Sequence, residues 1–332
     1  MRAVCFALLG VGLSVWGDDR LLLVRPTQYS GMADASAAVA VSSNLFVVAD
    51  DEDNLLRLYR SDRGGGPLKE FDCSAFLQWE GKYPEADLEG AARLGDRVFW
   101  IGSHGRNKDG KERLSRCCLF ATDIRAIDGA VTLTPVGKPY RRLLVDLISD
   151  SRFEQFHLAE AAKRAPKAPG GLSIEGLSAT PGGHLLIGFR NPIPGGNALL
   201  IPLLNPNEVI EGKPGRFDPA IQLDLGGLGV RDIVYHEGIF IIIAGSWHEG
   251  GPSRLYRWAG VGARPGPLTV AHLGGYNPEA IVIYPQTGLR ELQILSDDGN
   301  RAIDRVPGKE VSDPPPSSGR RCVERSSKRE WI

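Results

Sequence analysis

Short apolar runs alternate with turn residues along most of the chain. In "GLSIEGLSATPGGHLLIGFRNP", residues 171–192, one run is followed by a turn at residues 181–183 and then by a longer apolar run at residues 185–189. Two such runs with turn residues between them are typical of a β-hairpin. Glu175 lies at the start of the first run, beside positions that the pattern assigns to the apolar face.

Five hairpins of this kind occur along the chain, and each begins with an acidic residue. The five acids are Asp34, Glu89, Glu175, Asp232 and Glu279. A third and a fourth apolar run follow the hairpins, as in "SRLYRWAG" and "LTVAHLGGYN", and the fourth run leads into the next acid. Four antiparallel strands per unit, repeated about every 40–50 residues, are typical of the blades of a propeller.

The predicted fold class is therefore all-β, a β-propeller with five blades or, as the alternative, six. The fifth unit is short, and "RLLLVRPTQYSGM" precedes Asp34 as the other fourth runs precede their acids. We expect this N-terminal strand to lie beside the last blade at residues 20–25 and to close the ring, which removes a sheet edge prone to aggregation. The long interval between Glu89 and Glu175 leaves room for a sixth blade, but residues 148–166 are typical of a helix.

Strand direction predicts where the five acids lie. In each blade the first strand begins, and the antiparallel second strand ends, at the same rim of the central channel. The acids would therefore ring one mouth of the channel, beside the groups that end the second strands. Those groups are Asp50 and Asp51, Ser103 and His104, Arg190, Ser246 and His248, and Asp297 and Asp298.

Composition excludes some classes of partner. Glycine accounts for 41 of 332 residues, which agrees with many tight turns, and the formal net charge of −1 does not favour a nucleic-acid partner. The sequence contains no apolar stretch of the roughly 18 residues that a transmembrane helix needs. We expect a monomer that binds a small molecule or a protein on one propeller face.

The two ends of the chain differ from its middle. Residues 1–17 resemble a signal peptide, with one Arg, an apolar run and small residues, and predict a secreted or periplasmic protein; a first buried strand is the alternative. The propeller would then span residues 18–306. Residues 307–332 are rich in Pro, Ser and charge, which predicts a disordered C-terminal tail. If residues 1–17 are removed, Cys73, Cys117, Cys118 and Cys322 remain, with a spacing that matches no zinc site.

Three segments carry a resemblance to a known family. They are "DLEGAA", "SIEGLSATPGGHLLIGFRNPIPGGNALL" and "NPEAIVI", and the resemblance spans roughly residues 30–300. The chain resembles an uncharacterised bacterial family of secreted propellers, domain of unknown function 3616, and is similar in pattern to the esterase-like phytase propellers. The resemblance implies a propeller but no settled reaction.

The acid ring is the candidate binding site. The residues expected to bind a ligand there are Asp34, Glu89, Glu175, Arg190, Asp232 and Glu279. Arg190 suits a phosphate or carboxylate group. The sequence implies no cofactor by itself, but oxygen-rich rings suit Ca²⁺, and the densest acids are Asp50, Asp51 and Asp53 in "ADDED". The same "ADDED" segment is also compatible with a hydrated turn.

Two functions stay open from the sequence. One is a binding protein for a small anionic ligand, a cation or a protein partner at the channel mouth. The other is a metal-assisted hydrolase or lyase that acts on a phosphate or sugar ester at the same mouth. In the second, Glu175, His104 and His248 are the candidates for proton transfer. Repetition of the acids favours a structural role for some of them, since catalysis needs one asymmetric arrangement.

Overall fold

The computed structural model describes residues 4–10, 20–32, 34–79, 81–127, 130–271 and 276–296. Several sequence predictions fall outside these ranges. They concern the tail at residues 307–332, Asp297, Asp298, Cys322 and most of the predicted signal peptide.

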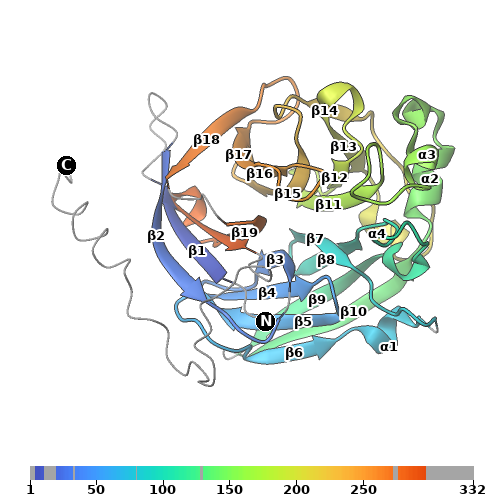
Figure 1. Cartoon of the computed structure of the whole chain (residues 1–332). Coiled ribbons are helices and arrows are strands. Elements are labelled where there is room, and N and C mark those ends of the chain that lie inside the picture. The colour runs from blue at the N-terminus through green and yellow to red at the C-terminus, as the bar shows by residue number, and fades with distance from the viewer. Residues whose placement is uncertain are drawn as a thin grey trace, which may run out of the picture.

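Three sheets of four strands make up the first part of the molecule (Figure 1). The first contains β3 (Ala35–Ala40), β4 (Leu45–Asp50), β5 (Leu55–Arg60) and β6 (Lys69–Asp72). The second contains β7 (Leu88–Leu94), β8 (Arg97–Gly102), β9 (Leu119–Ile127) and β10 (Ala130–Tyr140). The third contains β11 (Ser173–Ala179), β12 (Leu185–Asn191), β13 (Ala198–Leu203) and β14 (Ile221–Leu223), so the hairpin predicted at residues 171–192 is confirmed.

The remaining eight strands form one continuous sheet. Its strand order is β15-β16-β17-β18-β2-β1-β20-β19. The strands are β15 (Gly229–His236), β16 (Ile239–Gly245), β17 (Ser253–Trp258), β18 (Gly266–Ala271), β2 (Arg20–Gln28), β1 (Val4–Gly10), β20 (Glu291–Ser296) and β19 (Pro278–Ile283).

The all-β propeller class is confirmed, but the prediction of five or six blades closed by one N-terminal strand is wrong. The described strands form four blades, because β2 hydrogen-bonds to β18 in parallel and joins the last two groups of strands into one sheet. The N-terminus supplies two strands, β1 and β2, and both lie inside this sheet instead of closing a ring. The hairpin period is a local signal, whereas this pairing joins strands more than 200 residues apart, which local periodicity does not specify.

The first strands of the hairpins lie around the middle of the molecule (Figure 1). These inner strands are β3, β7, β11, β15 and β19, and each packs against its neighbours in this order, with β19 also beside β3. Apolar side chains from facing sheets fill the space between blades, so β12 is buried along its whole length. Burial on both faces explains why its sequence is a nearly continuous apolar run and does not alternate.

The helices are short. They are α1 (Ser74–Leu77), η1 (Leu114–Arg116), α2 (Leu143–Ser149), η2 (Ser151–Phe156), α3 (Leu158–Ala161), η3 (Pro194–Gly196), α4 (Pro206–Val209) and η4 (Gly288–Arg290). The single helix predicted at residues 148–166 is divided, because His157 has a φ of 52° and separates η2 from α3. The segment that contains η2 and α3 packs Phe153, Phe156 and Leu158 against the core between the second and third blades.

Candidate functional site

Each inner strand contains a β-bulge close to its start. Each of the five strands has a register shift at one of these residues: Ser36, Glu89, Glu175, Arg231 and Glu279. A second shift occurs in β11 between Ser173 and Ile174. A bulged residue is left out of the regular ladder and its side chain is re-aimed. The five bulges therefore present four charged side chains and one hydroxyl group at the same end of the inner strands.

A cavity of about 750 Å³ lies at this end, and all five bulge residues line it. We call it the bulge cavity. Its lining comes from the bulges and from the loops around them: Asp34, Ala35, Ser36, Asp51, Glu89, Lys167, Glu175, Arg190, Arg231, Ser246, His248, Glu249, Gly250, Gly251, Tyr276, Asn277 and Glu279. Its volume falls within the range of small-molecule sites, roughly 300–1,000 Å³.

Two arginines pair with two of the acids in the cavity wall. Arg190 Nη1 donates to Glu175 Oε1 at 2.7 Å, and Arg190 Nε donates to the Ser246 carbonyl oxygen at 2.8 Å. Arg231 Nη1 donates to Glu279 Oε1. These contacts fix both guanidinium groups at the cavity wall, since charge-assisted hydrogen bonds are stronger than neutral ones.

Three buried atoms in the wall lack a hydrogen-bond partner. They are Asp51 Oδ1, Glu175 Oε2 and Arg231 Nε. Glu175 is only 4% exposed and Arg231 only 8% exposed, so neither of the last two atoms is compensated by bulk water. Buried polar groups are nearly always hydrogen-bonded in proteins, and an exception inside a cavity indicates a place for a ligand or an ion.

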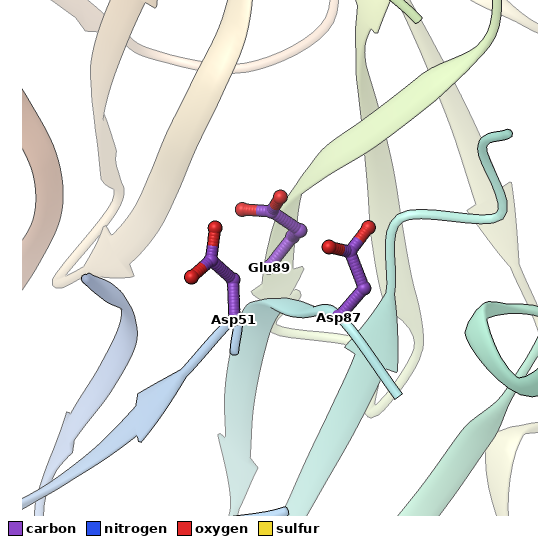
Figure 2. A group of neighbouring side chains, drawn as sticks. All are labelled: Asp51, Asp87 and Glu89. Carbon is purple, nitrogen blue, oxygen red and sulfur yellow. The ribbon is translucent and has the colours of Figure 1, made fainter. Parts of the chain in front are cut away.

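Three carboxylates converge (Figure 2), and two of them, Asp51 and Glu89, line the bulge cavity. The ligand atoms of Asp51, Asp87 and Glu89 all lie within 4.8 Å of one another. Asp51 follows β4, Asp87 immediately precedes β7, and Glu89 is the β7 bulge. Asp87 has a φ of 52°, in the left-handed region, and its carboxylate lies beside that of Glu89 (Figure 2). We call these three residues the carboxylate cluster.

Burial and mutual repulsion disfavour the charged forms of the cluster. Burial and the charge of Asp87 raise the pKa of Asp51 to about 9. Burial and the charge of Glu175 raise the pKa of Glu89 well above its usual value. Burial also raises the pKa of Asp87, although Arg116, whose Nη1 lies 2.9 Å from Asp87 Oδ2, opposes the shift. A bound cation or bound protons would relieve this repulsion.

The other predicted site residues lie as follows. Asp34 and His248 line the bulge cavity. Asp50 and Asp53 both contact Arg57, at 3.6 and 2.5 Å, and only Asp51 of the "ADDED" acids belongs to the carboxylate cluster. Asp232 and His104 do not line the bulge cavity.

Asp232 and His104 are buried in the protein instead. Asp232 Oδ1 accepts from the backbone N–H of Ile233, and Asp232 Oδ2 accepts from that of Ile281 in β19. His104 is 3% exposed, its Nδ1 lies 2.8 Å from the Gly102 carbonyl oxygen, and its Nε2 has no partner.

Among the bulge residues and the carboxylate cluster, sequence reasoning missed three: Asp87, Ser36 and Arg231. Asp87 is two residues before Glu89 in "DLEG", and a second acid so close to a predicted ring acid was the available signal. Arg231 directly precedes Asp232, and a bulge shifts which of two neighbouring residues faces the channel. No sequence pattern marks the position of that bulge.

One family model matches the chain. Its description is "Protein of unknown function (DUF3616)", and it matches residues 34–118 and 129–272. No curated protein matches the sequence. None of the helices in the described part of the chain is long and apolar enough to cross a membrane.

Several solved structures are similar at low identity. Virginiamycin B lyase from Staphylococcus aureus is 8% identical over 82% of this chain and 70% of that chain, with a TM-score of 0.35. Trypanosoma rangeli sialidase is 12% identical over 82% of this chain and 45% of the sialidase chain, with a TM-score of 0.38. This chain therefore spans less than half of the sialidase. A Bacteroides thetaiotaomicron protein of unknown function is 13% identical over 80% of this chain and 50% of that chain, with a TM-score of 0.37. The activities in these names belong to those proteins.

Proposed function

The chain belongs to the DUF3616 family, whose function is unknown, and we propose that it is a propeller that binds a divalent cation at the carboxylate cluster. One observation carries the proposal: Asp51, Asp87 and Glu89 bring ligand atoms within 4.8 Å of one another. Among the described residues, no basic side chain pairs with Asp51 or Glu89. Three convergent carboxylates, of which only Asp87 has a basic partner (Arg116), suit a hard cation.

The chemistry of the cluster favours Ca²⁺ as the first ion to test. Calcium takes about 6–8 oxygen ligands, and carboxylates are its main protein ligands. Three residues supply only part of this shell, which leaves positions for water or for a bound molecule. A secreted or periplasmic location, which we also propose, would expose the site to calcium. The mass of the protein recovered outside the cytoplasm tests that location, since loss of residues 1–17 is expected.

Cation binding should stabilise the parent protein and should require Glu89. A single cation at 100 times its dissociation constant raises the free energy of unfolding by about 2.7 kcal/mol. In Glu89→Gln this stabilisation should disappear, while the cation-free variant should be at least as stable as the parent because one repelling charge is gone. Thermal melts and titration calorimetry with Ca²⁺, Mg²⁺ and Mn²⁺ after chelator treatment measure both quantities.

Asp232→Asn is the matched control for this experiment. Asp232 is also a buried acid of an inner strand, but it does not line the bulge cavity. Its replacement should leave the cation-induced shift in melting temperature unchanged. The proposal fails if the parent shows no response to any of the three ions, or if Glu89→Gln responds as the parent does.

A metal-assisted hydrolase or lyase acting on a phosphate or sugar ester is the second candidate. The observation that favours it is Glu175 Oε2, a buried carboxylate oxygen without a partner in the wall that also contains Glu89. Such an oxygen can accept a proton during a reaction. Turnover of phosphate or sugar esters that requires both added cation and Glu175 would support an enzyme. Cation binding without turnover would leave a binding protein for a small anionic ligand or a protein partner.

A further inference from the structure

The charge balance of the bulge cavity changes when a cation binds. Three acids in the wall already have basic partners, because Glu175 pairs with Arg190, Glu279 with Arg231, and Glu249 with Lys167 at 2.6 Å. Among the described residues, Asp51 and Glu89 have none. A divalent cation at the carboxylate cluster would bind these two groups and keep open coordination positions toward the cavity. An anion could then coordinate the cation, a contact that the empty cavity does not offer.

The two arginines retain capacity to bind an anion. Arg190 uses Nε and Nη1, and Arg231 uses Nη1, in the hydrogen bonds of the cavity wall. Within the described part of the chain, the Nη2 atom of neither arginine has a hydrogen-bond partner. Arg231 lines the same cavity as Asp51 and Glu89 of the cluster. A carboxylate group between the cation and these arginines would satisfy both.

The wall also offers an acceptor that an anion alone would not satisfy. Glu175 Oε2 is buried and lacks a donor. A second carboxylate placed next to it would be repelled, whereas a hydroxyl group can donate a hydrogen bond to it. The ligand that matches the wall therefore carries one carboxylate group and one or more hydroxyl groups.

We propose that the bulge cavity binds a small hydroxylated carboxylate together with the cation. Its carboxylate group contacts the cation and the guanidinium groups of Arg190 and Arg231, and one hydroxyl group donates to Glu175 Oε2. A single negative charge fits better than several, because the cavity wall is rich in acids. The proposal rests on the proposed cation site, and it predicts that cation and ligand each strengthen the binding of the other.

A matched set of six-carbon probes tests the ligand class: gluconate, hexanoate and sorbitol, titrated into the full chain in excess Ca²⁺. Gluconate should bind, whereas hexanoate lacks the hydroxyl groups and sorbitol lacks the carboxylate, so each should bind at least about tenfold more weakly. Removing Ca²⁺ should weaken gluconate binding by a similar factor. The ligand class is wrong if hexanoate or sorbitol binds as tightly as gluconate, or if gluconate binds equally well without the cation.

Arginine variants locate the ligand. Arg231→Lys and Arg190→Lys keep the positive charge but remove the forked donor, so gluconate affinity should fall about tenfold or more while the Ca²⁺ affinity changes little. Arg57→Lys, at a buried arginine that pairs with Asp53 outside the cavity, should bind gluconate as the parent does. If one cavity variant does not fold, the other still decides the point. Unchanged gluconate affinity in the cavity variants would overturn the proposed placement.

The two proposals fail in different ways. A parent protein that binds Ca²⁺ but not gluconate keeps the proposed cation site and loses the ligand. A parent protein that binds neither loses both. Gluconate that binds in the presence of Ca²⁺, with loss in Arg231→Lys or Arg190→Lys and not in Arg57→Lys, supports both together.

Discussion

His104 shows that a polar residue near the channel mouth is not necessarily a functional one. The sequence placed it among the proton-transfer candidates because it ends a second strand. In the structure its imidazole is buried, its Nδ1 is bound to the Gly102 carbonyl oxygen, and it does not line the bulge cavity. Burial disfavours the charged imidazole and lowers the pKa of His104 to about 4. A buried neutral histidine makes the stability of the protein depend on pH.

The pH dependence has a defined sign. Between about pH 6.5 and pH 4 the unfolded chain binds a proton at His104 that the folded protein excludes, so stability falls as the pH falls through this window. The free energy of unfolding that is lost through His104 over this window is about 3 kcal/mol. In His104→Asn, the decrease in free energy of unfolding from pH 7 to pH 4 should be smaller than in the parent by about this amount. Denaturant unfolding at several pH values measures it.

His157→Asn provides a matched control. His157 has a φ of 52°, close to the 56° of His104, and Asn tolerates this left-handed conformation, but the His157 side chain is exposed. Its replacement should leave the pH dependence of stability as in the parent. If the free energy of unfolding changes with pH equally in His104→Asn and in the parent, the folded protein does not exclude the proton from His104.

At the scale of the strand, the bulges decide which residues face the channel. The sequence located all five hairpins and three of the five bulge residues, Glu89, Glu175 and Glu279, because an acid before an apolar run is visible as a break in the pattern. It chose Asp34 and Asp232 where the structure has Ser36 and Arg231. Side chains alternate along a strand, so the shift of one residue from Asp232 to Arg231 reverses the face, whereas Ser36 lies two residues after Asp34. The bulge position depends on tertiary pairing, and local sequence does not specify it.

The carboxylate cluster was predictable only in part for the same reason. Asp51 stood out because it lies in a dense acidic run. The acids of this run have different partners, however, since Asp50 and Asp53 both contact Arg57 and only Asp51 belongs to the carboxylate cluster. Asp87 and Glu89 come from the next blade. Their meeting with Asp51 depends on how two blades pack, which is a property of the fold and not of either segment.

Asp232 should stabilise the contact between two inner strands. Its two carboxylate oxygens accept backbone N–H groups from Ile233 within β15 and from Ile281 in β19. In Asp232→Asn one of these oxygens becomes an amide donor that faces an N–H group, so the free energy of unfolding should fall by about 1–3 kcal/mol. Asp96→Asn, at an acid whose side chain is 88% exposed, should change it by no more than about 0.5 kcal/mol. Denaturant melts that give equal stabilities for the two variants would contradict this role.

At the scale of the whole molecule, the eight-stranded sheet joins the two ends of the described chain. β1 pairs with β20 over six residues and with β2 over seven, and β2 pairs with β18 at residues 269–271. Pairing between segments so far apart in sequence means that the last group of strands depends on the N-terminus for its hydrogen bonds. Edge strands that lose their partners expose unpaired backbone groups and favour aggregation.

Truncation from the N-terminus should therefore reduce stability in two steps. A chain that begins at Asp18, as cleavage of the predicted signal peptide would leave it, loses β1 and the pairs that β1 makes with β2 and β20. It keeps β2 beside β18, so we expect a cooperative transition at a lower temperature than in the full chain. A chain that begins at Tyr29 loses β2 as well, which leaves both β18 and β20 without these partners. It should melt lowest or without cooperativity, and calorimetry of the three chains gives the order. If the chain that begins at Tyr29 has the same melting temperature as the chain that begins at Asp18, β2 does not hold the sheet together.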